Sequence, residues 1–140
     1  MTDFIMKEIE TESELKAVLE MCYKVLGARN DELYGYDAWH KRLQDGLHPL
    51  VYASKNGKVV SAVLGRAENK DSLVIGFVAC HEDFRRQGIT KKLLLYFESL
   101  AKNKAFKYIT LGSQADVFYE KCGYKVIFQA HDQNIYQKIL

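Results

Sequence analysis

The stretch Cys80-His81-Glu82-Asp83-Phe84-Arg85-Arg86-Gln87-Gly88-Ile89-Thr90-Lys91-Lys92 is the part of the chain on which the predicted fold depends. An apolar run typical of a buried strand, residues 72–79, precedes it, and a segment with helical spacing of its apolar residues, 89–103, follows it. A basic turn therefore leads from a strand into a helix. The first-turn amides of a helix lack intrahelical partners and carry the positive end of its dipole, so they favour an anion.

Four basic side chains occupy this turn, namely Arg85, Arg86, Lys91 and Lys92. Cations are normally disfavoured in the first turn of a helix. A phosphate-rich ligand that supplies the missing negative charge is the simplest explanation for them. The alternative is an ordinary connection between a strand and a helix with a solvated basic rim.

Length and composition restrict the class of protein. With 140 residues the chain is expected to form one domain, residues 1–140. Its contents of 48% hydrophobic and 27% charged residues are ordinary for a globular protein. A chain of this length can bury a hydrophobic core without the help of disulfides. The net charge of +2 is too small for non-specific binding of nucleic acid, so no nucleic-acid partner is expected.

The three cysteines, Cys22, Cys80 and Cys122, are widely spaced and show no zinc-binding pattern, so no metal site is expected. They favour a reduced, cytoplasmic compartment. The start of the chain has no secretory signal, and no apolar run approaches the roughly 20 residues of a membrane helix, so no membrane association is expected. Cys80 and His81 do not form a nucleophilic pair, because neighbouring strand residues point to opposite faces.

Hydrophobic spacing, capping signals and turn residues give the order of the elements. Strands are expected at 4–9, 50–53, 59–66, 72–80, 107–111, 124–129 and 134–139. Helices are expected between the capping box Thr11-Glu12-Ser13-Glu14 and Gly27, at 37–44 with Asp37 as N-cap, at 89–103 and at 115–121. The first helix has a buried stripe of Leu15, Val18, Leu19, Cys22 and Leu26. This order predicts an α/β (α+β) fold, with a mixed, mostly antiparallel central sheet of about six to seven strands and helices on both faces.

The segment 28–48 is the least determined part of the chain. It places the aromatic residues Tyr34, Tyr36 and Trp39 close to several acids. One interpretation is the packing of an irregular helix. The other is a wall of a substrate pocket that suits a cationic amine.

Two short motifs and the order of the elements resemble the GNAT superfamily of acyl-CoA-dependent N-acyltransferases over essentially the whole chain. Residues 85–90, Arg-Arg-Gln-Gly-Ile-Thr, resemble the acyl-CoA loop of that family, Arg/Gln-x-x-Gly-x-Gly/Ala. Residues 118–124, Phe-Tyr-Glu-Lys-Cys-Gly-Tyr, resemble its Phe-Tyr-x-x-x-Gly-Phe/Tyr segment. Thr90 departs from the family pattern, and its hydroxyl is expected either to bond a phosphate oxygen or to cap the helix.

The resemblance implies acetyl-CoA as the acyl donor and CoA as a product. Backbone amides of the loop would hold the pyrophosphate, and backbone groups at the end of the strand 72–80 would pair with the pantetheine arm. The residues so implied are Phe77, Val78, Cys80, Arg85, Arg86, Gln87, Gly88, Ile89, Thr90 and Lys91. The asparagine that many relatives carry before the last helix is absent, and Ser113 or Gln114 is expected to replace its contact with the pantetheine.

The resemblance also implies a chemical role for Tyr119, because the matching tyrosine commonly protonates the departing CoA thiolate. A phenol has a pKa of about 10 and a thiol one of about 8.5. The alternative is that Tyr119 only packs on the acyl-CoA and orients its sulfur. The sequence does not identify the base that would take a proton from the acceptor. The candidates are Glu68, His81, Glu82, Asp37, His40 and a chain of water molecules.

The function so implied is the transfer of an acetyl group from acetyl-CoA to a primary amine on a small molecule or peptide, by direct attack in a ternary complex. One alternative is a non-catalytic acyl-CoA-binding module that senses or docks. Another is a domain whose basic turn binds a different phosphate ligand. The final pair of strands is the expected contact of a homodimer.

Overall fold

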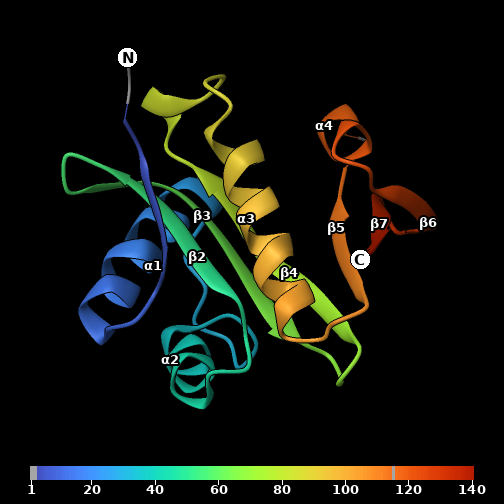
Figure 1. Ribbon diagram of the computed structural model, residues 1–140, viewed down its shortest axis with the longest axis horizontal. Helices are drawn as coiled ribbons and strands as arrows, with labels where there is room; N and C mark the ends of the chain where they lie inside the picture. The colour runs from blue at the N-terminus through green and yellow to red at the C-terminus, as the bar shows by residue number, and fades with distance from the viewer. Residues whose placement is uncertain (1–2, 115) are drawn as a thin grey trace.

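Seven strands form one sheet within residues 3–114 and 116–140, which the computed structural model describes (Figure 1). The strand order is β1-β2-β3-β4-β5-β7-β6. The strands are β1 (Ile5–Glu8), β2 (Leu50–Lys55), β3 (Lys58–Ala67), β4 (Ser72–Cys80), β5 (Tyr108–Ser113), β6 (Lys125–Ala130) and β7 (Gln133–Ile139). All neighbouring pairs are antiparallel except β4 and β5. The prediction of a mixed, mostly antiparallel sheet is confirmed.

Helices cover both faces of this sheet, as the sequence predicts (Figure 1). They are α1 (Glu12–Leu26), α2 (Tyr36–Asp45), the 3-10 helix η1 (Glu82–Phe84), α3 (Ile89–Asn103) and α4 (Val117–Lys121). Helix α3 packs Phe97 onto Val63 and its neighbours on one face. Helices α1 and α2 pack Leu15 and Trp39 with Phe77 on the other. No helix in the described part of the chain is both long and apolar enough to cross a membrane.

The capping signals predict the start of the first helix correctly and that of the second incorrectly. The Thr11 hydroxyl accepts a hydrogen bond from the Glu14 amide (3.1 Å), and the Glu14 carboxylate accepts one from the Thr11 amide (3.1 Å). Asp37 is not the N-cap of α2, because that helix begins earlier and its N-cap is Gly35. The Asp31 side chain stabilises the turn that precedes α2, because its Oδ1 accepts a hydrogen bond from the Tyr34 amide (2.7 Å).

The aromatic residues of the segment 28–48 pack mainly on the sheet. The indole of Trp39 is fully buried, and it stacks on the Tyr34 ring with centroids 5.6 Å apart. Both rings lie over Gly76, where the register of β3 and β4 shifts by a bulge. A Cβ atom at Gly76 would lie 2.6 Å from Cε1 of Tyr34 and 3.0 Å from Cη2 of Trp39. Packing is therefore the correct interpretation for these two residues.

The strands β4 and β5 are paired over only part of their length. Their parallel register joins residues 72–74 to residues 108–110 and ends there. Beyond this point β4 continues to Cys80, while β5 remains paired with β7. The two central strands therefore diverge toward their C-terminal ends, which leaves one edge of β4 open.

Strand β6 forms one edge of the sheet and exposes apolar side chains. Val126, Ile127 and Phe128 are 41%, 47% and 55% exposed. In Figure 1 the β6–β7 pair projects away from α1, α2 and α3. A homodimer contact at this strand pair stays a prediction.

Candidate active site

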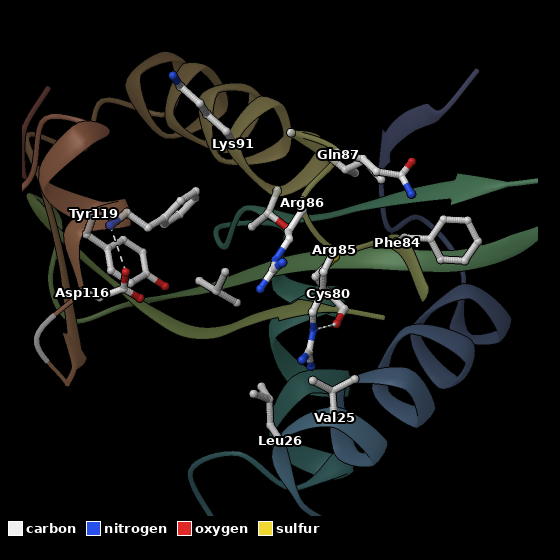
Figure 2. A pocket seen from close by; sticks show the side chains of 15 residues that line it. Val25, Leu26, Cys80, Phe84, Arg85, Arg86, Gln87, Lys91, Asp116 and Tyr119 are labelled. Atoms are coloured by element: carbon white, nitrogen blue, oxygen red, sulfur yellow. Dashed lines mark hydrogen bonds between the residues drawn. The ribbon is translucent and has the colours of Figure 1, made fainter. Parts of the chain in front are cut away.

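A cavity of about 640 Å³ lies at the C-terminal end of β4, between the loop that leads into α3, the last turn of α1, and α4 (Figure 2). It is lined by Val25, Leu26, Val78, Cys80, Phe84, Arg85, Arg86, Gln87, Gly88, Ile89, Thr90, Lys91, Asp116, Phe118 and Tyr119. The cavity therefore brings together the whole of the first motif, residues 85–90, and the first two residues of the second, Phe118 and Tyr119. Its charged lining comprises three basic side chains and one carboxylate, so it favours an anionic ligand.

The loop before α3 presents backbone amides to this cavity. Arg86 and Gly88 have left-handed backbone conformations, with φ of 65° and 76°. Gly88 is the N-cap of α3, and the first intrahelical bond of the helix runs from the Lys92 amide to the Gly88 carbonyl (3.2 Å). The amides of the three preceding helical residues, 89–91, consequently lack intrahelical acceptors. Turns that contain such left-handed residues can point successive backbone amides into a concavity, which binds anions.

Thr90 has a structural contact that explains its departure from the family pattern. Its hydroxyl lies 3.2 Å from Oγ of Ser61, which is buried and donates to the Ala79 carbonyl (2.9 Å). Because Ser61 uses its own proton on Ala79, Thr90 is the donor to Ser61. The side chain therefore joins the start of α3 to β3 and β4. The expected role as a helix cap is wrong, since no side chain caps α3.

The alternation of backbone hydrogen bonds determines which residues of β4 face the cavity. The His81 amide donates to the Val60 carbonyl (2.8 Å). Paired residues in an antiparallel ladder alternate between those that exchange hydrogen bonds and those that do not. Ala79 and Phe77 therefore bond to β3, whereas the backbone groups of Val78 and Cys80 point to the open edge. The structure places Val78 and Cys80 at the cavity and leaves Phe77 out, with its ring in the core beside α1 and α2.

Helix α4 brings Tyr119 to the cavity (Figure 2). The side chain is only 7% exposed, and its ring packs edge-on against Phe118 and Tyr124, with centroids 5.2 and 6.0 Å away. Burial, together with the nearby charge of Asp116, raises the pKa of the Tyr119 hydroxyl to about 12. The hydroxyl therefore keeps its proton at physiological pH and is available as a hydrogen-bond donor.

Asp116 is the only carboxylate among the lining residues, and the sequence reading missed it. Its Oδ1 accepts from the Phe118 amide (2.9 Å) and so caps α4. Its own amide donates to the Tyr136 hydroxyl on β7 (2.9 Å). An aspartate just before a short apolar helix is an ordinary N-cap signal, and its position three residues before Tyr119 was available in the sequence.

None of the candidate bases named from the sequence lines the cavity. Glu68 lies beyond the end of β3 and contacts Arg66. His81 accepts a hydrogen bond from the Asp83 amide (3.2 Å) and lines a separate groove. The others are Glu82 in η1, and Asp37 and His40 on α2.

Two further residues lie elsewhere than expected. Ser113, at the end of β5, pairs with Asn134 of β7 and does not line the cavity, and neither does Gln114. Leu26 was expected on the buried stripe of α1, but it is 50% exposed and forms part of the cavity wall with Val25. The buried stripe of α1 ends at Cys22, because the last turn of the helix lies beyond the edge of the packed core.

Solved structures share this arrangement of strands and helices. An acetyltransferase from Streptococcus agalactiae matches with a TM-score of 0.78 at 20% identity, over 98% of both chains. The PaiA N-acetyltransferase from Thermoplasma acidophilum, in complex with coenzyme A, matches with 0.77 at 15%, over 99% of both. A GNAT family acetyltransferase from Elizabethkingia anophelis, with acetyl-CoA bound, matches with 0.75 at 16%, over 98% of both. At these identities the likeness establishes the fold, which is the GNAT fold.

The sequence itself establishes the family. Residues 10–124 match the model of the acetyltransferase (GNAT) family. The chain belongs to this family, which is a class of acetyl-CoA-dependent N-acetyltransferases. No curated protein sequence matches the chain significantly.

Proposed function

We propose that the protein transfers the acetyl group of acetyl-CoA to a primary amine by direct attack in a ternary complex. One observation carries this proposal: the amide-rich loop of residues 85–91, the open edge of β4 and the hydroxyl of Tyr119 all face one cavity. Phosphate binding, alignment of a thioester and hydrogen bonding to a departing sulfur each need one of these parts.

The loop supports the pyrophosphate end of acetyl-CoA. The unpaired amides of Ile89, Thr90 and Lys91 and the left-handed residues Arg86 and Gly88 give it donors for phosphate oxygens. Thr90 contributes its amide, since its hydroxyl is turned to Ser61. The basic side chains of Arg86 and Lys91 add charge that stabilises bound phosphate.

The open edge of β4 supports the reacting end of the donor. Backbone groups of Val78 and Cys80 would pair with the pantetheine arm as a further strand does. An amide donor at this edge would hold the thioester oxygen and stabilise the negative charge that develops on it during attack. The amine nitrogen forms a bond to the carbonyl carbon, the bond from carbon to sulfur breaks, and the nitrogen gives up a proton.

Tyr119 acts on the departing sulfur as a hydrogen-bond donor. Its pKa of about 12 lies well above the value of about 8.5 for a thiol, so complete transfer of its proton to the thiolate is unfavourable. A hydrogen bond that shortens as charge grows on sulfur requires no such transfer. The thiolate is then protonated by water or by the proton that the amine nitrogen releases.

The test is release of CoA thiol from acetyl-CoA in the presence of a panel of primary amines, together with calorimetric titration of the protein with CoA and with ATP. We expect tighter binding of CoA than of ATP and thiol release with at least one amine. Equal affinity for CoA and ATP would show that the turn serves another phosphate ligand.

A second candidate is binding of acyl-CoA without catalysis. It is favoured by one observation: the bases named from the sequence all lie outside the cavity. This candidate predicts that CoA binds but that no amine in the panel increases thiol release above the rate of hydrolysis.

A further inference from the structure

The head of Arg85 lies on the side of the cavity that α1 supplies. Its Nε donates to the carbonyl oxygen of Cys80 over 3.4 Å, where the chain leaves β4. Figure 2 shows the side chain extending past Cys80 toward Val25 and Leu26, away from the start of α3. The first arginine of the loop therefore points to the wall formed by the end of α1.

Arg85 has no carboxylate partner in the part of the chain that the structure describes. None of the ion pairs found there includes it. Asp83, two residues earlier, faces His81 instead, with Oδ2 3.7 Å from Nδ1. Asp116 is the N-cap of α4, on the opposite side of the cavity in Figure 2. A guanidinium has five N–H donors and stays charged, so the single bond to Cys80 leaves most of its donors available to an anion.

The proposed pyrophosphate site has basic charge of its own beside the Arg85 side chain. The pyrophosphate would lie against the amides of residues 86–91, where Arg86 and Lys91 supply charge. The guanidinium of Arg85 lies beside the C-terminal end of β4, on the side that faces away from those amides. Because a guanidinium pairs with a carboxylate or phosphate through two parallel hydrogen bonds, it suits an oxyanion that enters from the α1 side.

We propose that Arg85 determines the acceptor specificity of the enzyme by binding an oxyanion, either a carboxylate or a phosphate, on the same molecule as the reacting amine. The inference rests on the proposed acetyl transfer and names its acceptor class: a primary amine that carries an anionic group. Val25 and Leu26 provide an apolar wall for the carbon chain between the two groups. This class adds an anionic group to the cationic amine that the segment 28–48 suggests.

The experiment compares three amines of similar length: 3-aminopropanoate, 2-aminoethyl phosphate and the neutral 3-aminopropan-1-ol. We expect kcat/KM of the wild-type protein to favour one or both anionic amines by roughly 10- to 100-fold, the range of a charge-assisted hydrogen bond. The two anionic probes distinguish a carboxylate from a phosphate acceptor. In Arg85→Gln this preference should disappear through a higher KM for the anionic amine, measured at acetyl-CoA concentrations that saturate each protein.

The matched variant is Arg86→Gln, the next arginine of the same loop. It should weaken the binding of CoA and retain the preference for anionic amines. The inference is overturned if the wild-type protein does not distinguish the three amines, or if Arg85→Gln weakens CoA binding as Arg86→Gln does and leaves the preference intact.

A binding measurement decides the question without turnover. Calorimetry of the protein–CoA complex with the N-acetyl derivatives of the three probes should give tighter binding of an anionic derivative to wild-type protein than to Arg85→Gln. Equal binding to both overturns the inference about Arg85. Failure of CoA itself to bind would instead overturn the proposed function, so the two failures are distinguishable.

Discussion

The hydroxyl of Tyr136 on β7 accepts a hydrogen bond from the Asp116 amide over 2.9 Å, which joins the last strand to the turn that begins α4. Tyr136 is fully buried, and its ring centroid lies 5.6 Å from that of Tyr119. Helix α4 has only five residues, too few to be stable by itself. Tyr119 is therefore held in position by a residue that does not line the cavity.

Replacing Tyr136 by phenylalanine tests this positioning. Tyr136→Phe keeps the ring and removes the acceptor of the Asp116 amide, together with two longer hydrogen bonds of the hydroxyl, from Asn134 (3.5 Å) and to the Asp116 carbonyl (3.4 Å). We expect a loss of about 1 kcal/mol of stability, the usual value of one hydrogen bond. We also expect a severalfold lower kcat with an unchanged Kd for CoA, because the loop that binds CoA is not affected. Urea unfolding and steady-state kinetics measure these quantities.

Tyr23→Phe is the matched control. The Tyr23 hydroxyl makes one short hydrogen bond, to the Tyr34 carbonyl (2.8 Å), and it does not line the cavity. It should lose similar stability and keep kcat. An equal kcat for both variants would show that Tyr136 has no role in positioning Tyr119.

The pH dependence of Tyr119→Phe separates a hydrogen-bond donor from a group that titrates. Burial raises the pKa of Tyr119 to about 12, so its hydroxyl is protonated throughout the range from pH 6 to 9.5. We expect the variant to have a kcat roughly 5- to 30-fold lower, which corresponds to one or two kcal/mol. The ratio of wild-type to variant kcat should be constant over that range. A ratio that changes with a midpoint below pH 10 would contradict the raised pKa.

Local patterns in the sequence were sufficient to predict the elements of this fold. The capping box at Thr11, the apolar spacing of α3 and the glycine of the loop at Gly88 each involve residues within one or two turns of one another. An anion site on the loop is predicted for the same reason, because the amides near Gly88 are at a helix start whatever the rest of the chain does. The assignment of acetyl-CoA to this site rests on the family resemblance.

Contacts between distant residues were not predictable in this way. The exclusion of Phe77 from the cavity follows from the pairing of β3 and β4, in which Phe77 bonds to β3 while Val78 and Cys80 point to the open edge. The placement of Tyr119 depends on Tyr136, 17 positions along the chain and on another element. Residue type alone identifies the candidate bases, and it gives no distance to the cavity. Asp116 was missed because a helix cap and a cavity carboxylate look alike in the sequence.

Gly76→Ala tests whether close packing under the aromatic pair supports the fold. An added Cβ would lie 2.6 Å from Tyr34 and 3.0 Å from the fully buried ring of Trp39, so neither ring can move aside easily. We expect a loss of about 1–3 kcal/mol in the free energy of unfolding, as for other overpacked cores. Urea denaturation measures it.

Gly112→Ala is the control for this substitution. Its added Cβ would meet the side chain of Gln133, with Oε1 at 2.9 Å, and that exposed side chain can rotate away. The expected change is within about 0.5 kcal/mol, as at most surface positions. Equal losses in the two variants would mean that the aromatic pair imposes no special constraint on Gly76.

The carboxylate of Glu14 is expected to stabilise the fold at neutral pH and to lose this effect in acid. Partial burial opposes its charge, but hydrogen bonds from Lys7 (2.7 Å), from the Tyr52 hydroxyl and from backbone amides outweigh burial and lower its pKa to about 2. An unfolded glutamate has a pKa of about 4.3. Since the folded value is the lower one, the contribution is fully present above about pH 5 and is lost as the pH falls toward 2.

Glu14→Gln should therefore be less stable than wild-type protein at pH 7, and the difference in the free energy of unfolding should narrow between pH 5 and 2 in urea unfolding. Glu20→Gln, an exposed position on the same helix, should show no such gap at either pH. A gap for Glu14→Gln that stays constant from pH 7 to 2 would show that the lost stability comes from the shape of the side chain and not from its charge.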